Sequence, residues 1–477
     1  MEYFLSSRKP NLIYKLYLLS FKKNSELKYN KKLKFLYLKN YKMPSLRYIV
    51  FFLSNILSGK IFDKNNRANI SYRNIKIGNH VISYTYRNIK SYKSISYFYF
   101  NLIKNFFIAG CFIRTSEIYL KKYRFKSIYL DHLMYLNGIY YQVFAKNKKI
   151  IYSNNYPKST FMIDFTKGKK KYINPSEAHK LQYLERDLRN NEKKKIETLK
   201  KKYLKQNHKF IPWLKDTKYN NLKINSKIKL DDYQYIIYPH AFTDAQLMDG
   251  FDGFETSYDW LLFTLEFMKK NKINAIIKGH PNFYKKELGI LSLWDKEIFE
   301  IIEKKYRKNK NFYFINKSID NLSIINQLNK KCIALTHNGS VILELSLHNI
   351  KTISSSKAAW AKKFKVSNQW SNINEYKNLL SKNWSNLNYS NREGINKLYH
   401  QLYFNKFSFH GKNSIHKIIR GSLKKSNNLI KHNSKKVFST DVSSKNLSYQ
   451  EKIFEKSFPI ESQKKFINTL SQGVENI

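Results

Sequence analysis

The stretch INAIIKGHP, residues 273–281, decides the fold. Its apolar run has the length of a buried strand and ends in Lys278, Gly279, His280 and Pro281, and the proline prevents the strand from continuing. On either side, SYDWLLFTLEFMKK and LWDKEIFEIIEKKYRK have the spacing of amphipathic helices. A short apolar strand between two such helices indicates a parallel sheet that is covered on both faces.

The same alternation extends outward from this strand over residues 233–356. Further strands are predicted at YQYIIYPH, NFYFIN, KCIALTH and IKTISSS, and further helices at SIDNLSIINQLN and VILELSLHN. We therefore predict an α/β, Rossmann-like domain over residues 226–404, in which ligands bind at the carboxyl ends of the strands.

The first half of the chain carries a weaker form of this pattern. FKSIYLDH, LMYLNGIYYQVFAK and KKIIYSN predict a strand, a helix and a strand at 125–154, after a long apolar helix at 99–123. We assign residues 1–195 to an N-terminal α/β domain on the acceptor side. A charged connecting helix is predicted at 177–206, and residues 405–477 are predicted to form a basic polar tail that is partly mobile.

The composition indicates a folded, strongly basic protein. The chain has 477 residues and a formal charge of +54, from 88 Lys and Arg against 34 Asp and Glu. Its 42% hydrophobic and 16% aromatic residues exclude a disordered chain. The excess of Lys fits either A/T-rich codon usage or a polyanionic or anionic-membrane partner. In both cases the surface attracts phosphorylated ligands.

The cysteines and the apolar segments indicate in which cellular compartment the protein is expected. Only Cys111 and Cys332 occur, which argues against a disulfide framework and favours a reducing cytoplasm. The N-terminal segment mixes charges with apolar residues and lacks the pattern of a signal peptide. The most apolar segment, LRYIVFFLSNIL at 46–57, is shorter than the roughly 20 residues that span a bilayer, so we expect a buried helix there.

Polar residues follow the strand at 273–278. Lys278 offers a positive charge, and Gly279 lets a ligand approach the backbone. His280 can donate to a phosphate oxygen or titrate as a leaving group departs. The alternative is a histidine that only caps a strand end.

A second strand end, LTHNGS, has the residues of an anion site. Asn338, Gly339 and Ser340 precede a predicted helix, whose amino terminus attracts negative charge. Glu344 lies one turn further along, where it can accept hydrogen bonds from ribose hydroxyls. Alternatively, Asn338 or Ser340 only caps the helix and Glu344 is a solvated acid.

A third strand end, YPHAFTDA, contributes His240 and Asp244 and continues into the glycine-rich DGFDG. The aspartates lack the spacing of a calcium-binding loop, and a surface turn is the alternative for DGFDG. Three strand ends that each combine His with Asp, Lys or Ser predict a ligand site at one edge of the sheet.

The segments YPHAFTDA, YDWLLFTLEF, IIKGHP and LTHNGSVILELSLHNIKTI resemble the C-terminal half of bacterial surface-carbohydrate and capsule polysaccharide biosynthesis glycosyltransferases. That group is similar to capsular Kdo transferases, polysialyltransferases and CDP-glycerol glycerophosphotransferases. IKIGNHVISYTYR and LDHLMYLNGIYYQVF resemble segments of its first domain, so the resemblance covers about residues 70–400. It implies the GT-B fold, with two Rossmann-like domains facing across a cleft and the nucleotide bound mainly by the second.

The resemblance also implies roles for individual residues. His280 matches the residue that contacts the nucleotide phosphate and assists the leaving group, and Asp244 matches the acid after the first strand of the second domain. We predict as catalytic residues His280, Asp244 and His240. The predicted donor-binding residues are Lys278, Asn338, Gly339, Ser340 and Glu344. No metal site is predicted.

The leading hypothesis is a metal-independent glycosyltransferase. It would move a sugar from a nucleotide donor to a bacterial surface polysaccharide or its lipid-linked precursor. The first candidate for the donor is a CMP-activated acidic sugar, and no cofactor besides this donor substrate is expected. We expect it in the cytoplasm, peripherally at the inner face of the membrane, with an anionic membrane surface but no nucleic acid as a partner. The alternatives are a CDP-alditol phosphotransferase making a teichoic-like polymer and a basic nucleic-acid-binding protein.

Overall fold

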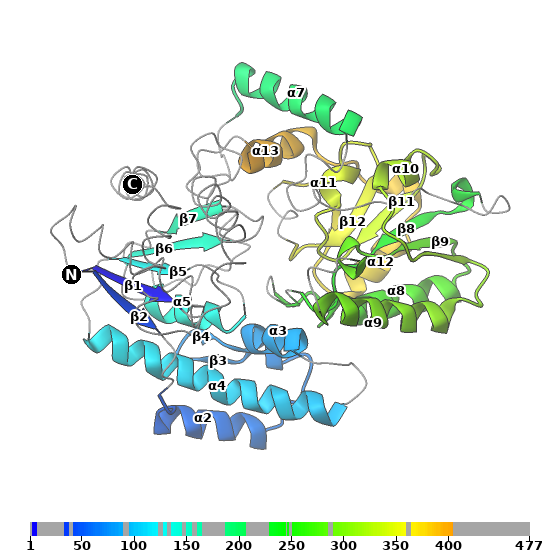
Figure 1. Cartoon of the computed structure of the whole chain (residues 1–477). Helices are drawn as coiled ribbons and strands as arrows, with labels where there is room; N and C mark the ends of the chain where they lie inside the picture. Colours follow the sequence, from blue (N-terminus) through cyan, green and yellow to red (C-terminus); the bar gives the residue numbers. More distant parts are fainter. Residues whose placement is uncertain are drawn as a thin grey trace, which may run out of the picture.

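The computed structural model of the chain describes two α/β units (Figure 1). The predicted tail at 405–477 and the first part of the predicted connecting helix lie outside the described residues. The described residues are 2–6, 33–37, 42–88, 95–122, 127–130, 135–145, 149–154, 160–164, 187–206, 229–244, 246–247, 250–284, 290–358 and 364–403.

The C-terminal unit is built on a six-stranded parallel sheet (Figure 1). The strand order is β10-β9-β8-β11-β12-β13. The strands are short, and their near-continuous apolar runs fit the burial of most of their side chains. Their bounds are β8 Tyr235–Tyr238, β9 Ala275–Lys278, β10 Phe312–Ile315, β11 Ile333–Thr336, β12 Lys351–Ser355 and β13 Asn368–Trp370.

Helices cover both faces of this sheet (Figure 1). The helices α8 (Ser257–Lys270), α9 (Ile290–Tyr306) and α12 (Ile373–Leu380) pack on one face, which we call the α8 face. The short helices α10 (Asn321–Ile325) and α11 (Ile342–Leu345) pack on the opposite face, the α11 face. The predicted Rossmann-like domain is therefore confirmed.

Successive strand residues point to alternate faces, as the period of a β-strand requires. The α8 face buries Ile237, Ile277 and Leu335, from β8, β9 and β11. The α11 face buries the residues that precede them, which are Ile236, Ile276 and Ala334. This alternation also decides to which face the polar residues at the strand ends belong.

Two helix predictions differ in accuracy. Helix α8 has the predicted bounds, and it begins after Thr256, whose hydroxyl accepts a hydrogen bond from the Asp259 amide. Helix α11 covers only four of the nine residues predicted at 341–349. The chain turns at Asn349, where φ is 54°, to enter β12.

The N-terminal unit combines long helices with small sheets. The predicted strand, helix and strand are present as β5, α5 and β6, with β5 and β6 parallel and β7 added antiparallel. A separate pair is formed by the parallel strands β1 and β2, and another by the antiparallel strands β3 and β4. The bounds are β1 Glu2–Ser6, β2 Leu33–Tyr37, α2 Leu46–Leu57, β3 Ser71–Tyr72, β4 Ile75–Lys76, α3 Gly78–Asn88, α4 Ile95–Lys122, β5 Ser127–Leu130, α5 Asn137–Ala145, β6 Lys149–Asn154 and β7 Thr160–Asp164.

Helix α2 has the bounds of the apolar segment predicted as a buried helix, but only one of its faces is buried. Tyr48 and Phe52 pack toward α4, and the Tyr48 hydroxyl donates to the Phe106 carbonyl oxygen at 2.7 Å. Leu46 and Leu57 are 76% and 87% exposed. The prediction of burial was therefore wrong for half of this helix, because the other face has no partner among the described residues.

The charged helix predicted between the halves is observed as α7 (Asn190–Gln206), and it packs against α13 (Arg392–Tyr403). Its narrow apolar stripe is used there, since Ile196 lies in one core with Ile395 and Tyr399. Between 190 and 206, this helix therefore belongs to the C-terminal unit.

The loop between β8 and α8 joins the two units. Its Leu247 lies in the core of the N-terminal unit, and its Glu255 forms a buried ion pair with Arg67. Two α/β units in contact at the carboxyl edge of the larger sheet are the GT-B type of architecture predicted from the sequence. Among the described helices, none combines the length and apolarity required to cross a bilayer.

Candidate functional site

The strand order identifies one position on the sheet as the natural ligand site. From β8 the chain proceeds outward through β9 and β10, and it then returns to the other side of β8 to form β11, β12 and β13. The connections that leave β8 and β11 therefore run toward opposite edges of the sheet. In open α/β sheets, ligands bind in the crevice outside the carboxyl ends of the two strands at such a switch point.

A small pocket opens at this switch point. The predicted residues His240 and Asn338 line it, one from the end of β8 and one from the turn after β11. The remaining lining residues come from the β8–α8 loop, the start of α8 and the ends of β11 and β12, namely Gln246, Leu247, Gly250, Asp252, Ser257, His337, Ser355, Lys357 and Ala358.

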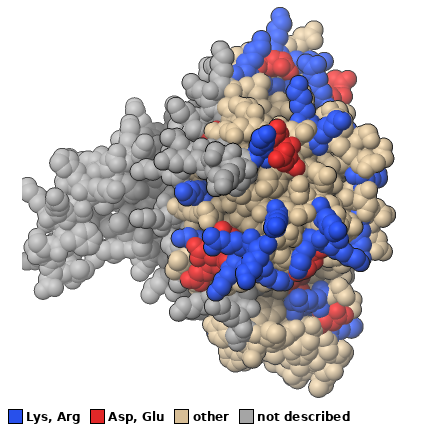
Figure 2. All heavy atoms as spheres, turned by 90° about the vertical axis from the view of Figure 1, so that its right-hand side faces the viewer, with Lys and Arg blue, Asp and Glu red and all other residues tan. Residues whose placement is uncertain are grey.

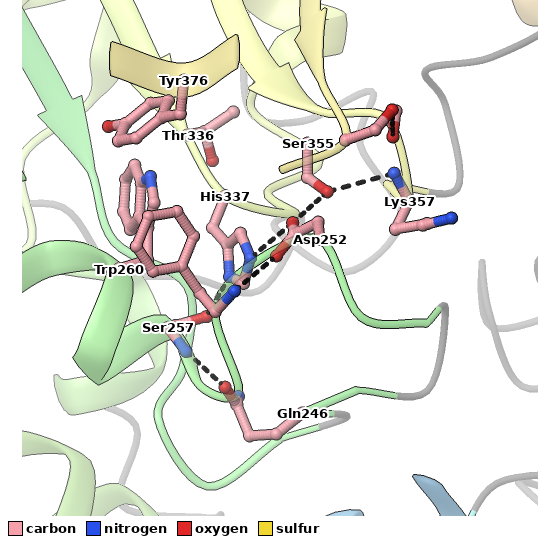
Figure 3. A network of polar contacts seen from close by, with 12 residues as sticks. Gln246, Asp252, Ser257, Trp260, Thr336, His337, Ser355, Lys357 and Tyr376 are labelled. Carbon is pink, nitrogen blue, oxygen red and sulfur yellow. Dashed lines mark hydrogen bonds and ion pairs between the residues drawn. The ribbon is translucent and has the colours of Figure 1, made fainter. Parts of the chain in front are cut away.

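Asp252 and His337 form the centre of a polar network in this pocket (Figure 3). The His337 Nε2 atom lies 3.0 Å from Asp252 Oδ2, and its Nδ1 atom lies 3.1 Å from the Ser257 hydroxyl. Asp252 also accepts hydrogen bonds from the Ser355 hydroxyl and, at 3.1 Å, from the Phe254 amide. Both oxygens of the carboxylate thus accept hydrogen bonds from named donors.

These contacts define the protonation state of the network. Burial alone would raise the pKa of Asp252, but His337 and the hydrogen bonds from Ser355 and Phe254 together hold it below its ordinary value. An ionised Asp252 accepts the Nε2 proton of His337, and in the neutral ring Nδ1 then accepts from Ser257. The imidazole is therefore held in one tautomer and one orientation.

Aromatic rings hold the same imidazole from the side. The ring of His337 stacks on Trp260 at a centroid distance of 5.6 Å and on Trp370 at 6.0 Å. Trp260 is fully buried on α8 and Trp370 on β13. Such packing limits rotation of the ring, so His337 presents a defined edge to the pocket.

The predicted catalytic histidines lie side by side. The ring centroids of His240 and His280 are 5.8 Å apart, because β8 and β9 are neighbours and both residues follow their strands by two positions. Burial lowers the pKa of His240, so its imidazole is neutral at neutral pH. The Asn282 amide donates to Nδ1 of His280 at 3.1 Å, which assigns the proton of a neutral His280 to Nε2.

Asp244, the third predicted catalytic residue, faces the N-terminal unit. Its Oδ1 atom accepts from Arg87 at 2.9 Å and from the Tyr135 hydroxyl at 2.6 Å. Arg87 comes from α3 and Tyr135 precedes α5. The carboxylate therefore connects the two units at the edge of the site.

Lys278 and Glu344 lie together but below the strand end. Lys278 is only 2% exposed, and the alternation along β9 places it on the α11 face with Tyr238. Glu344 is buried there and accepts from the Asn321 amide at 2.7 Å, so it is not a solvated acid. Burial lowers the pKa of Lys278 and raises that of Glu344, since each charge has left water.

The turn at 338–340 follows β11 as predicted, but it does not lead into a long helix. The Gly339 amide donates to the Thr336 hydroxyl at 3.0 Å, and a Cβ atom at this position would collide with the same hydroxyl. The four residues of α11 give little macrodipole. The expected attraction of an anion by a helix terminus at Ser340 is therefore not supported.

Several residues that line the pocket were not predicted as site residues, among them Gln246, Ser257, Ser355 and Lys357. Gln246 accepts from the Ser257 amide at 2.6 Å, and the Lys357 amide donates to Ser355 at 3.0 Å. The serine run at the end of the β12 segment, another strand end with hydroxyls, was the one usable signal for Ser355. Among the described residues, no group of His, Cys, Asp and Glu side chains has the arrangement of a metal site.

No protein-family model matches the chain. No curated protein matches it either.

Solved structures with some similarity are enzymes that handle sugars. The beta Kdo 2,4 transferase KpsC of Thermosulfurimonas dismutans has 9% identity and a TM-score of 0.35, covering 58% of this chain and 79% of its own. A UDP-GlcNAc 2-epimerase of Methanocaldococcus jannaschii, in complex with UDP-GlcNAc and UDP, has 11% identity and a TM-score of 0.24. The match covers 83% of this chain and 97% of the epimerase chain. The N-terminal domain of trehalose-6-phosphate phosphatase of Candida albicans has 11% identity and a TM-score of 0.22. The match covers 98% of this chain and 96% of that domain's chain. At these identities and TM-scores the similarities identify neither a family nor an activity.

Proposed function

We propose that this protein is a glycosyltransferase that uses a nucleotide-activated sugar. The preferred donor is a CMP-activated acidic sugar, and the acceptor is a bacterial surface polysaccharide or its lipid-linked precursor. The observation that carries the proposal is the pocket at the switch point between β8 and β11, with His240 and His337 on its wall and His280 beside His240. The resemblance of the strand-end motifs to capsule glycosyltransferases supplies the substrate class.

The leaving nucleotide would be stabilised from the β9 and β11 ends. In the reaction, the bond between the anomeric carbon and the phosphate oxygen breaks, and negative charge develops on the phosphate. Nε2 of His280 can donate to that oxygen because Nδ1 is occupied by the Asn282 amide. We assign the turn at Asn338, Gly339 and Ser340 to the nucleotide phosphate.

Lys278 and Glu344 would act on the donor from below the strand end. Lys278 contributes positive charge through a medium of low dielectric constant, where its field is less screened than in water. Glu344 would be the group for ribose hydroxyls, which it can reach only if the donor's nucleoside enters on the α11 face. This requirement makes the assignment of Glu344 testable by comparing ribo- and 2′-deoxynucleotides.

The acceptor hydroxyl needs a base, and His240 is the better of the two candidates. Nδ1 of His240 is buried and makes no hydrogen bond within the described structure, and the lowered pKa keeps the ring neutral. Asp244 is held by Arg87 and Tyr135, which compete for its lone pairs. We assign proton transfer to His240, with Asp244 as the neighbouring carboxylate that favours the imidazolium once it forms.

The proposal includes metal-independent chemistry, a cytoplasmic location and peripheral attachment at the inner face of the membrane. It does not include nucleic acid as the main partner, since the lysines are spread along the whole sequence and no nucleic-acid-binding motif is recognised in it. Figure 2 shows basic side chains on the visible face, with fewer acidic ones among them. A nucleic-acid groove would gather the basic ones in one stripe.

A nucleotide panel tests the proposal and separates it from a CDP-alditol phosphotransferase. The melting temperature is measured with CMP, CDP, UDP and GDP, since a ligand at about 100 times its Kd stabilises the folded state by about 2.7 kcal/mol. We expect CMP to give the largest shift. A CDP preference would favour the phosphotransferase, and no shift with any nucleotide would refute the proposal.

Matched variants localise the binding. Asn338→Ala should abolish the shift because Asn338 lines the pocket, whereas Asn386→Ala, at an exposed position, should leave it unchanged. An equal shift in both variants would place the nucleotide elsewhere.

A further inference from the structure

Large apolar side chains are exposed mainly on one part of the N-terminal unit. Of the thirteen large hydrophobic residues that are exposed in the described structure, nine lie between residues 43 and 100. These nine are Met43, Leu46, Val50, Leu53, Leu57, Phe62, Ile95, Tyr97 and Phe100. Scattered exposed apolar residues are normal, but a concentration of this kind marks an interaction surface.

Helix α2 carries four of these nine residues. Leu46, Val50, Leu53 and Leu57 are 76%, 60%, 48% and 87% exposed. Their spacing of four, three and four residues places them in one stripe along a helix that is about 18 Å long. We call these four residues the α2 stripe.

The opposite face of the same helix is firmly attached to the protein. Tyr48 is 1% exposed and bonds the Phe106 carbonyl of α4, while Phe52 packs on Phe107 at a centroid distance of 6.2 Å. Helix α2 is thus held with its long axis along α4 (Figure 1) and with the α2 stripe turned outward. A helix with this orientation can lie in the plane of an interface.

The charges around the α2 stripe select the kind of partner. The described residues between 42 and 122 include twelve Lys or Arg and two acids, Asp63 and Glu117. Two of the twelve, Arg67 and Arg87, are paired with acids of the C-terminal unit. Lys42, Arg47 and Lys60 flank the stripe and are exposed. Helix α2 itself contains no acidic residue.

This combination points away from a second copy of the chain. Two copies that met through the α2 stripe would bring two basic rims together, which is unfavourable. An anionic lipid surface instead offers headgroups to the Lys and Arg side chains and an apolar layer to the leucines. In Figure 2, the lower end of the molecule, where α2 lies in Figure 1, is free of charged side chains, and basic side chains lie above it.

We infer that the α2 stripe is the site by which this protein docks on anionic lipid bilayers. The four aliphatic side chains enter the boundary between headgroups and acyl chains, and the flanking Lys and Arg side chains remain among the headgroups. The inference uses none of the pocket residues, so it holds or fails independently of the reaction proposed for the pocket.

Vesicle flotation with the full chain tests the inference. The probes are phosphatidylcholine vesicles with and without phosphatidylglycerol, at low and at high salt. We expect the protein to float with the anionic vesicles and to be released partly by salt. Val50→Glu with Leu53→Glu should lower the partition coefficient at least about tenfold, because both charges would enter the apolar layer.

The matched control carries the same two changes on another exposed helix surface. Leu293 and Ile301 on α9 are 53% and 45% exposed, and Leu293→Glu with Ile301→Glu should float like the unmodified protein. Equal loss in both double variants would overturn the inference, since it would show a response to net charge alone. No flotation of the unmodified protein, or a dimer that the α2 variant dissociates, would also overturn it.

A labelling experiment covers the case in which the α2 variant does not fold. Cys111 and Cys332 are buried, so a cysteine introduced as Val50→Cys can be labelled selectively with an environment-sensitive fluorophore. We expect its emission to increase and shift to the blue with anionic vesicles, while a label at Leu293→Cys does not respond. The same response at both positions, or at neither, refutes docking through α2.

Discussion

The buried ion pair between Arg67 and Glu255 joins the two units and offers a quantitative test of the junction. Nε of Arg67 donates to Glu255 Oε2 at 3.1 Å, and Nη2 donates to both carboxylate oxygens, at 2.5 Å for Oε2. The two side chains are 0% and 1% exposed. Glu255→Gln therefore removes the countercharge of a guanidinium that has no access to water.

The expected cost follows from this burial. Leaving one charge of a buried pair without its partner costs about 3–5 kcal/mol. By the usual scaling for domains of about 150–250 residues, this lowers the melting temperature by roughly 6–20 °C. Replacing both residues, Arg67→Met with Glu255→Met, should cost much less than the single change, since no charge is left buried.

An exposed pair provides the matched control. Lys296 and Glu300 on α9 are 3.5 Å apart, with side chains 48% and 54% exposed. Glu300→Gln should cost less than about 1 kcal/mol because water screens such pairs. Urea denaturation of the four proteins measures the free energies of unfolding. The reasoning is refuted if Glu255→Gln is as stable as Glu300→Gln, or if the double methionine variant is no more stable than Glu255→Gln.

Three further predictions concern the site and its pH dependence. His280→Ala should lower turnover by about 10²- to 10⁴-fold with little change in melting temperature, and a folded variant with full activity would reject its role as a proton donor. Asp252→Asn should lower kcat/KM at least about tenfold and alter the pH profile, because His337 loses the carboxylate that orients it; an unchanged profile would contradict this. Burial raises the pKa of Asp295 from 3.8 to about 7, so ionising this group costs stability as pH rises through that window, and the melting temperature of Asp295→Asn relative to the unmodified protein should increase between these pH values. A difference that does not vary with pH would show that Asp295 is not the titrating group.

The elements of the C-terminal unit were predictable because each carries a complete local signal. The strand β9 is a short apolar run closed by glycine and proline, and α8 has helical spacing after a threonine cap. Parallel pairing follows from the helices between the strands. Since parallel strands end at the same edge, the closeness of His240 and His280 followed as well.

The network around Asp252 was not predictable in the same way. Asp252 lies in the β8–α8 loop, His337 follows β11 and Ser355 ends β12, so three separate segments must meet. That meeting depends on which strands are neighbours, and local spacing does not carry the order of strands. The exposure of α2 also escaped prediction, because an apolar segment of 12 residues is compatible with burial of either face.

Placing Lys278 at a ligand edge neglected the period of the strand. Ile277 points to the α8 face and Ile276 to the α11 face, so Lys278 must follow Ile276. Tyr238 obeys the same rule on the neighbouring strand, and Lys278 Nζ lies 5.9 Å from its ring centre. The end of a strand therefore determines at which edge of the sheet a residue lies. The residue's odd or even position along the strand determines to which face its side chain points.

The loop from His240 to Thr256 connects the two units. Near its start, Asp244 is held by Arg87 and Tyr135 of the N-terminal unit, and at its end Glu255 is held by Arg67. Asp252, which orients His337, lies between these two attachments. Asp252 is thus flanked along the chain by two residues that contact the N-terminal unit.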